Sequence, residues 1–449
     1  MESEFFGTER ISRILMRLAP PVMLAQLIQA LYNIVDSFFV GRFSDTGLTA
    51  LSIVYPLQLL MIALAVGTGV GINTAMAYFL GTRDRKRSDE AAGISTALSL
   101  VMWAVFALLV AVLMPAYARM STESEAVIAD VIVYGRIVCV CSIGLFLESG
   151  WTKVLQAEGN MNRPMAAQIL GAVTNIVLDP LFIFALNMGV RGAALATIIS
   201  QCLSCVWVLR FLTGPKTMLR LKKENIRIAP ALVLPCVALG SATFIMQASE
   251  SVISMCFNSS LLKYGGDIAV GAMTILSSVM QFAMLPLQGI GQGAQPIISY
   301  NYGARNTERV RRTFWLLLRV SLCYSVLLWA IIQLFPGVFA RMFTPKAELI
   351  DFTVTALRIY CGALFLFGIQ IACQMTFVST GNAVCSIIVA IMRKFVLLIP
   401  LIYILPHFLA DKTRAVYTAE PIADILAVTF TIILFTVQFK KALKNLGQA

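Results

Sequence analysis

Long apolar runs, each without any Asp, Glu, Lys or Arg, dominate the chain, and polar residues gather between them. Clear examples cover residues 18–35, 91–118, 192–209, 228–249 and 320–340. Since about 20 residues of helix cross the hydrocarbon core of a bilayer, each of these runs predicts one membrane-spanning helix.

Two further apolar runs are much longer, and they decide the helix count. Residues 46–82 and 268–304 are each 37 residues without a charge, enough for one long tilted helix or two short ones. The charges of the intervening loops favour one helix each, which predicts an all-α polytopic membrane protein with twelve transmembrane helices. These begin near residues 18, 46, 91, 127, 164, 192, 230, 268, 313, 352, 383 and 421.

The composition agrees with a membrane protein. Hydrophobic residues make up 59% of the 449 residues, charged residues make up 13%, and the mean hydropathy is +0.82. A soluble protein could not cover so much apolar surface with so few charges. The net charge of +12 fits basic loops on the cytoplasmic side of a membrane, so we expect no nucleic-acid partner.

Most of the basic residues fall on one face of the predicted bundle. That face receives the N-terminal segment, the loop at 81–90, Lys153, Arg163, the segment at 213–227, the loop at 303–312 and the C-terminal lysines. The opposite face has few basic residues and an acidic stretch at 123–130. This asymmetry predicts that both termini are cytoplasmic.

The second half of the chain repeats the first. A shift of 222 residues pairs Gly67, Gly69, Gly71, Tyr78 and Gly81 with Gly289, Gly291, Gly293, Tyr300 and Gly303. Six helices per half is an even number, so the halves share one orientation about an axis along the membrane normal. We expect two pseudo-symmetric six-helix lobes, an N-lobe (1–212) and a C-lobe (231–449), joined by a basic cytoplasmic linker (213–230). Such an architecture is typical of secondary transporters.

Motifs of other function classes are absent. No GxxxxGK[ST] sequence indicates an ATP motor, and His407 is the only histidine, which excludes most histidine-based catalysis and metal chemistry. No nucleophile–base pair stands out, so we expect neither an enzyme nor a cofactor. The strings GTGVG (67–71) and GIGQG (289–293) look like phosphate-binding loops. They lie inside apolar helices, however, where small residues permit close packing.

Ionisable residues inside the predicted spans are few, and such residues are costly in lipid unless they have a function. They are Asp36, Arg136, Glu148, Asp179, Glu250, Arg358, Arg393, Lys394 and Asp424. Asp36 lies about 7 Å, and Asp179 about 12 Å, below the outer ends of their helices. Thr197 lies at a similar depth, and Asn175 is one helical turn before Asp179.

A proline adds to the oxygen ligands at this depth. Pro180 has no N–H for the carbonyl of Ile176, which loosens the backbone beside Asp179. Carboxylates, an amide and a hydroxyl suit a proton or a small hard cation. The repeat fails here, since Asp179 corresponds to Ile399 and Asn175 to Phe395. The acidic site is therefore expected in the N-lobe alone.

Seven motifs then identify a family that the chain resembles. They are NIVDSFFVG (33–41), GTRD (81–84), QAEGNMNRP (156–164), TNIVLDPLFIF (174–184), VRGAALAT (190–197), YNYGARN (300–306) and EPIADIL (420–426). Together they resemble the multidrug and toxic compound extrusion (MATE) family, in its DinF-like branch, over essentially the whole chain. The resemblance implies the MATE fold and export of amphipathic, often cationic drugs and toxic compounds by cation-coupled antiport. It also implies a monomer in the bacterial cytoplasmic (inner) membrane, surrounded by lipid.

The resemblance places the coupling site at Asp36, Asn175, Asp179 and Thr197, with H⁺ favoured as the coupling ion and Na⁺ as the alternative. These four are the only residues expected to hold a metal ion. Glu250 and Arg393 are candidates for substrate binding or for a secondary charge. Sodium-coupled relatives of another branch carry acids on helices 7 and 10. Helix 10 has no acid deeper than Asp351 here, which argues against a sodium site in the C-lobe.

The expected mechanism is alternating access. A proton or sodium ion from outside would neutralise the Asp36–Asp179 pair, helix 1 would bend, and substrate would be expelled, so that ion and substrate compete for N-lobe charge. The nearest alternative is a lipid-linked oligosaccharide flippase of the same superfamily, which should have a more basic cavity. A channel or a receptor is a further alternative.

Overall fold

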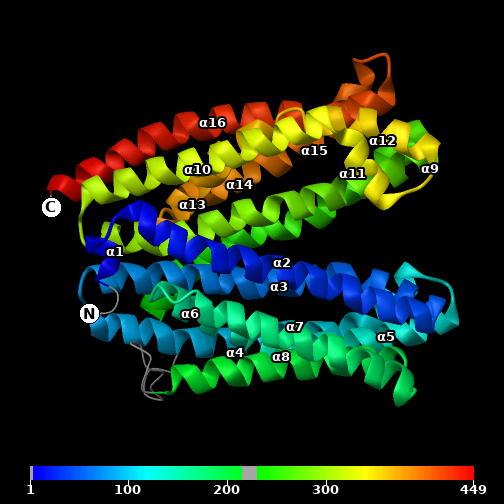
Figure 1. The fold of residues 1–449 in the computed structure, drawn as a ribbon, viewed down its shortest axis with the longest axis horizontal. Helices are drawn as coiled ribbons and strands as arrows, with labels where there is room; N and C mark the ends of the chain where they lie inside the picture. The colour runs from blue at the N-terminus through cyan, green and yellow to red at the C-terminus, as the bar shows by residue number, and fades with distance from the viewer. Residues whose placement is uncertain (1–3, 215–229, 449) are drawn as a thin grey trace.

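The computed structural model describes residues 4–214 and 230–448, and in these segments the chain is helical, without strands. Figure 1 shows two layers of long helices side by side, with α2–α8 in one and α10–α16 in the other. Both chain termini lie at the same end of the bundle, here named the terminal end. The expected linker lies, apart from Thr213, Gly214 and Pro230, outside the described residues.

The first half of the chain forms a short helix followed by six spans. The elements are α1 (Phe5–Thr8), α2 (Ile11–Phe43), α3 (Asp45–Gly81), α4 (Arg85–Ser121), α5 (Glu125–Val140), α6 (Ile143–Ala157), α7 (Asn162–Pro180), the π-helical turn η1 (Leu181–Ala185) and α8 (Val190–Leu212). Helix α3 confirms that the first 37-residue run is one helix. We assign α2–α8 to the N-lobe.

The second half, which we assign to the C-lobe, has more breaks. The elements are α9 (Pro230–Gly303), α10 (Thr307–Leu334), α11 (Pro336–Phe343), α12 (Ala347–Tyr360), η3 (Leu364–Leu366), α13 (Phe367–Ser379), α14 (Ala383–Ile391), the π-helical η4 (Met392–Leu398), α15 (Ile399–Ile404), η5 (Leu405–His407) and α16 (Lys412–Gln448). Helix α9 is broken at Gly266, whose φ of 70° is open to glycine at little cost.

The described residues contain the twelve spans that the apolar runs predict. Ten helices are long and apolar enough to cross a membrane, and α12 with α13 forms an eleventh span, bent by 41°. One of the ten is α9, which contains two spans because of the break at Gly266. Four helices begin six or more residues before their predicted starts: α2 at Ile11, α4 at Arg85, α10 at Thr307 and, with the largest difference, α16 at Lys412. The last span begins at Lys412 rather than near residue 421, because the charges of its first turns belong to the helix.

The prediction that Lys153 lies in a cytoplasmic loop is also wrong. The residue lies in α6 and is 7% exposed. Its ammonium group donates to Gln156 at 3.0 Å and, across the lobes, to Gln292 at 3.2 Å. The buried ammonium can lie within a span because two amide oxygens accept its hydrogen bonds. Assigning basic residues to loops from the sequence could not predict these partners.

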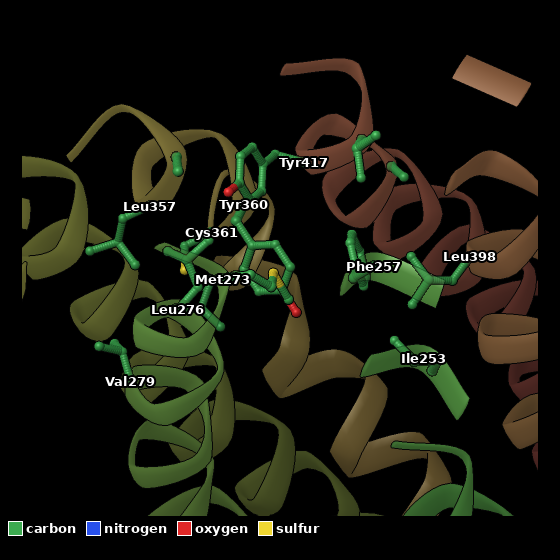
Figure 2. Packing of buried hydrophobic residues seen from close by; sticks show 14 of the residues in the cluster. Ile253, Phe257, Met273, Leu276, Val279, Leu357, Tyr360, Cys361, Leu398 and Tyr417 are labelled. Atoms are coloured by element: carbon green, nitrogen blue, oxygen red, sulfur yellow. The ribbon is translucent and has the colours of Figure 1, made fainter. Parts of the chain in front are cut away.

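Apolar side chains fill the interior of each half. Figure 2 shows the main C-lobe cluster, in which Phe257, Leu276, Tyr360 and Leu398 come together from α9, α12 and η4. Tyr417 joins this cluster and donates its hydroxyl to the carbonyl of Ala269 at 2.7 Å, so the polar tip is satisfied. Another cluster crosses the lobes and packs Leu18 and Val22 of α2 against Ile290 of α9. The charged residues below are exceptions to this apolar interior.

The two lobes meet through glycines at the terminal end. A Cβ atom on Gly81 would lie 2.0 Å from the carbonyl oxygen of Tyr300, and one on Gly303 would lie 2.2 Å from that of Tyr78. These four residues are the repeat partners found in the sequence, so this contact lies on the pseudo-symmetry axis. Farther along α3, a Cβ atom on Gly71 would lie 2.0 Å from the carbonyl oxygen of Cys236. The close-packing interpretation of the glycine strings is thereby confirmed.

We predict that Gly71→Ala destabilises the contact between the lobes. The added methyl group would meet the backbone of α9, which cannot move aside as a side chain can, so the free energy of unfolding should fall by about 2 kcal/mol. The measurement is thermal unfolding of the purified protein in detergent.

Gly271→Ala is the matched control on α9. The nearest atom to its added methyl group is a side-chain carbon of Leu349 at 3.7 Å, an ordinary contact. Alanine also favours helix, so this variant should unfold at the wild-type temperature or slightly above it. Equal melting temperatures for the two variants would contradict the proposed role of Gly71.

Candidate cation-coupling site

Two carboxylates, an amide and a hydroxyl come close together inside the N-lobe. Asp36 on α2 is 5% exposed, Asn175 and Asp179 on α7 are fully buried, and Thr197 on α8 is 2% exposed. Asp36 contacts both Asp179 and Asn175, and Thr197 lies beside Tyr32, which is one helical turn before Asp36 on α2. The structure therefore brings the four residues predicted for ion coupling into one small region, between three different helices.

Hydrogen bonds satisfy only one side of each carboxylate. The Tyr134 hydroxyl donates to Oδ2 of Asp36 at 3.3 Å. The Asn175 amide donates to Oδ2 of Asp179 at 3.1 Å, across one turn of α7. Each carboxylate thus has one oxygen held in place and the other oxygen free to bind.

Five buried oxygens in this region have no hydrogen-bond partner among the described residues. They are Oδ1 of Asp36, Oδ1 of Asn175, Oδ1 of Asp179, Oγ1 of Thr197 and the hydroxyl of Tyr32. A buried polar atom without a partner costs free energy, so such a cluster calls for an explanation. The oxygens fit a proton or a small hard cation, which would use those that the protein leaves free.

The backbone of α7 widens directly after Asp179. Pro180 ends the α-helical hydrogen bonding, and residues 181–185 continue as the π-helical turn η1, in which Leu186 N–H donates to the carbonyl of Leu181 at 2.9 Å. The predicted loosening beside Pro180 is present. Asp179, two residues before this turn, is fully buried.

Tyr32 and Tyr134 are parts of this region that sequence reasoning missed. Tyr32 is four residues before Asp36 and therefore on the same helix face, a signal that was available. Tyr134 lies on α5, far from the other residues in sequence, and only the fold brings it to Asp36. Buried tyrosines are common in apolar helices, so its residue type alone carried no indication.

The C-lobe charges form a separate cluster, in which the basic groups already have partners. Arg393, in η4, donates to Glu420 at 3.0 Å and to Asp424 at 3.1 Å, both on α16. The guanidinium also lies 4.7 Å from the ring centre of Phe367. The neighbouring Lys394 pairs with Glu250, whose side chain is 60% exposed.

The structure therefore keeps Glu250 and Arg393 apart from the N-lobe site, each in an ion pair of its own. Glu420 was missed because the last helix was expected to begin after it. One oxygen of Asp424, Oδ2, is buried and has no hydrogen-bond partner among the described residues. Charge in this lobe is consequently balanced within the protein to a greater extent than in the N-lobe.

Comparison with known proteins gives consistent relatives. Multidrug export protein MepA of Staphylococcus haemolyticus is 22% identical over 428 residues, 94% of each chain. Probable multidrug resistance protein YoeA of Bacillus subtilis is 22% identical over 439 residues, which are 95% of this chain and 94% of the relative.

Solved structures match over the full length. A MATE crystallised in complex with MaL6 has a TM-score of 0.92 and 25% identity, and the match covers 100% of both chains. A MOP superfamily transporter from Pyrococcus furiosus has the same TM-score and identity over 99% of both chains. The fold is therefore the MATE fold of twelve transmembrane helices in two pseudo-symmetric lobes.

The family model for MatE matches the chain twice, at residues 21–181 and 242–404. One match falls in each half, as the internal repeat requires. The chain belongs to the MatE family.

Proposed function

We propose that this protein is a cation-coupled antiporter that exports amphipathic, often cationic compounds across the cytoplasmic membrane. The observation that carries the proposal is the Asp36–Asp179 contact, with unpartnered oxygens around it, in the interior of one lobe. Relatives named for multidrug export support the substrate class. The distribution of basic loops supports a terminal end that faces the cytoplasm.

The coupling follows from competition for negative charge. With both carboxylates ionised, the N-lobe attracts an organic cation, and a small ion bound at Asp36 and Asp179 removes that attraction. A ligand that binds one state of the transporter better than the other shifts the balance between the states. Loading the site from outside therefore favours release of the substrate, and the reverse exchange at the cytoplasmic side completes the cycle.

A proton is the coupling ion that we propose first. Asp36 and Asp179 contact one another directly, and two carboxylates in contact repel unless one proton is shared between them. Sodium is the second candidate, because the five unpartnered oxygens also form a ligand set for a small hard cation. Asn175 and Thr197 would act as neutral ligands in either case.

The flippase alternative is less well supported. A flippase for a phosphate-linked lipid needs basic side chains available to the phosphate groups. Arg393 pairs with Glu420 and Asp424, and Lys394 pairs with Glu250, so the deepest basic residues of the C-lobe are already engaged. Glu250, more than half exposed, is the C-lobe residue that we propose as a secondary contact for cationic substrates.

We predict that Asp36→Asn and Asp179→Asn abolish coupled transport without preventing folding. The measurement is uptake of a fluorescent organic cation into everted membrane vesicles with an acidic lumen, and both variants should fall to the level of vesicles that lack the protein. A sodium gradient in place of the pH gradient separates the two coupling ions.

Asp45→Asn is the matched control, since Asp45 is an exposed carboxylate at the first turn of α3 in the same lobe. It should transport like the wild type. Full uptake by both site variants would overturn the proposed coupling site. Wild-type vesicles that respond to neither gradient would overturn antiport itself and favour the flippase.

Arg393→Met tests whether Arg393 holds the C-lobe together or contacts substrate. Removing the guanidinium leaves Glu420 and Asp424 buried without their ion-pair partner, so the free energy of unfolding should fall by about 3 kcal/mol. Thermal unfolding in detergent gives the measurement. The control Arg414→Met breaks an exposed pair with Asp411 and should cost less than about 1 kcal/mol. Unchanged melting of Arg393→Met, together with lost uptake, would instead assign Arg393 to the substrate.

A further inference from the structure

A third buried carboxylate of the N-lobe, Glu148, has no place in the coupling site described above. It lies on α6 and is 5% exposed. Its Oε1 accepts a hydrogen bond from the Gln168 amide at 3.1 Å, and among the described residues it forms no ion pair. A buried carboxyl group without a cation partner is costly to keep, which indicates a function.

Glu148 lines a small polar cavity between α2, α6, α7 and α8. The cavity has a volume of about 60 Å³, enough for water, and its polar lining includes Gln29, Tyr32, Glu148, Gln168, Gln201 and Ser204. The amide oxygen of Gln201 is buried and has no hydrogen-bond partner among the described residues. Water or a transferred proton would satisfy such an atom.

The cavity continues the coupling site toward the terminal end. Gln29 is seven residues before Asp36 on α2, and Gln168 is seven residues before Asn175 on α7. Seven residues of helix span about 10 Å, so each glutamine lies about 10 Å along its helix axis from the site residue. Helix α2 begins at the terminal end, and helix α8 ends there. Gln201 follows Thr197 by one turn of α8 and is therefore closer to the terminal end. The lining residues are thus displaced together to one side of the Asp36–Asp179 pair.

Tyr32 lies between the coupling site and the cavity. Its hydroxyl is close enough to Asp36, Asp179 and Glu148 to interact electrostatically with all three, and it has no hydrogen-bond partner among the described residues. The titratable groups that interact with Glu148 are Tyr32 from α2 and Cys205 from α8. Neither of these is basic, so no cation competes with a proton for Glu148.

We infer that Glu148 receives the coupling proton on its way from the Asp36–Asp179 pair to the cytoplasm. The carboxylic acid of the pair gives its proton to the Tyr32 oxygen, while the Tyr32 hydroxyl gives its own proton to a water in the cavity that Tyr32 and Glu148 both line, and that water passes a proton on to the Glu148 carboxylate. Tyrosine is regenerated, the pair regains its negative charge, and Glu148 becomes neutral. Glu148 then releases the proton to water in the cavity. This inference rests on the proposed proton-coupled antiport.

The test uses everted vesicles with an acidic lumen, in which the cytoplasmic side of the transporter faces the bath. Uptake of a fluorescent organic cation is measured for the wild type, Glu148→Gln and Tyr32→Phe while the bath pH is varied at constant lumen pH. Both variants should take up the cation more slowly by on the order of tenfold, because proton release becomes limiting. Uptake should also lose its dependence on bath pH, whereas binding of the cation at equilibrium should be unchanged.

Three controls separate relay from structure. Glu123 is an exposed acid between α4 and α5, at the end of the bundle opposite the terminal end. Glu123→Gln should therefore behave as the wild type. Glu148→Asp should restore part of the uptake and its dependence on bath pH, because it keeps a carboxylate. Tyr32→Phe removes a hydroxyl that makes no hydrogen bond, so it tests the route even where Glu148→Gln fails to fold.

The outcomes distinguish the relay from the function on which it rests. Wild-type vesicles without proton-driven uptake would overturn proton-coupled antiport and, with it, the relay. Normal wild-type uptake, with wild-type rate and bath-pH dependence in Tyr32→Phe and in every folded Glu148 variant, would overturn the relay alone. Slower uptake with an unchanged bath-pH profile would assign these residues a structural role and would equally overturn the relay.

Discussion

Lipid supplies no hydrogen-bond partners, and this constraint governs the whole molecule. Backbone groups in a bilayer must be satisfied within the chain, so the described segments are helices joined by short turns. Polar side chains inside the spans must likewise find partners in the protein. Most of them do, as Lys153 does with Gln156 and Gln292. Oxygens that remain free in such surroundings are therefore informative, and they concentrate around Asp36 and Asp179.

The two lobes use one backbone plan for different electrostatic purposes. Each has a π-helical turn beside a proline, η1 after Pro180 and η4 before Pro400. In the N-lobe the turn adjoins Asp179, a carboxylate with a free oxygen. In the C-lobe it contains Arg393, which neutralises two carboxylates of α16. Duplication preserved the shape of the helix, while the charges placed on it diverged.

Contact between the lobes depends on close backbone approach at the terminal end. Glycine is needed where Gly81 meets Tyr300 and where Gly71 meets Cys236, because any side chain would collide with a carbonyl group. Polar contacts between the lobes join two neutral groups, as between Gln295 and Thr74 at 2.9 Å, or a charged group and an amide, as between Lys153 and Gln292 at 3.2 Å. The contacts named across this interface are therefore close packing and hydrogen bonds rather than ion pairs.

The sequence by itself determined the fold class, the twelve spans, the internal repeat and four residues of the candidate site. These are local or periodic properties: an uncharged run of sufficient length must span, and a carboxylate in the middle of one is recognisable as an exception. Helix ends were less certain where charges lie inside a helix, as Lys412 and Glu420 do in α16.

Only the tertiary structure decided which of the ionisable residues inside the spans lie close together. Asp36 and Asp179 are 143 positions apart in the numbering, and no periodicity relates them to Tyr134 or to Glu148. The tertiary structure likewise pairs Arg393 with Glu420 and Asp424. The carboxylates Asp36 and Asp179 of the N-lobe have no such basic partner among the described residues. The charge of a residue is written in the sequence, but its partner, and hence whether the charge is available to an ion, depends on how the helices pack.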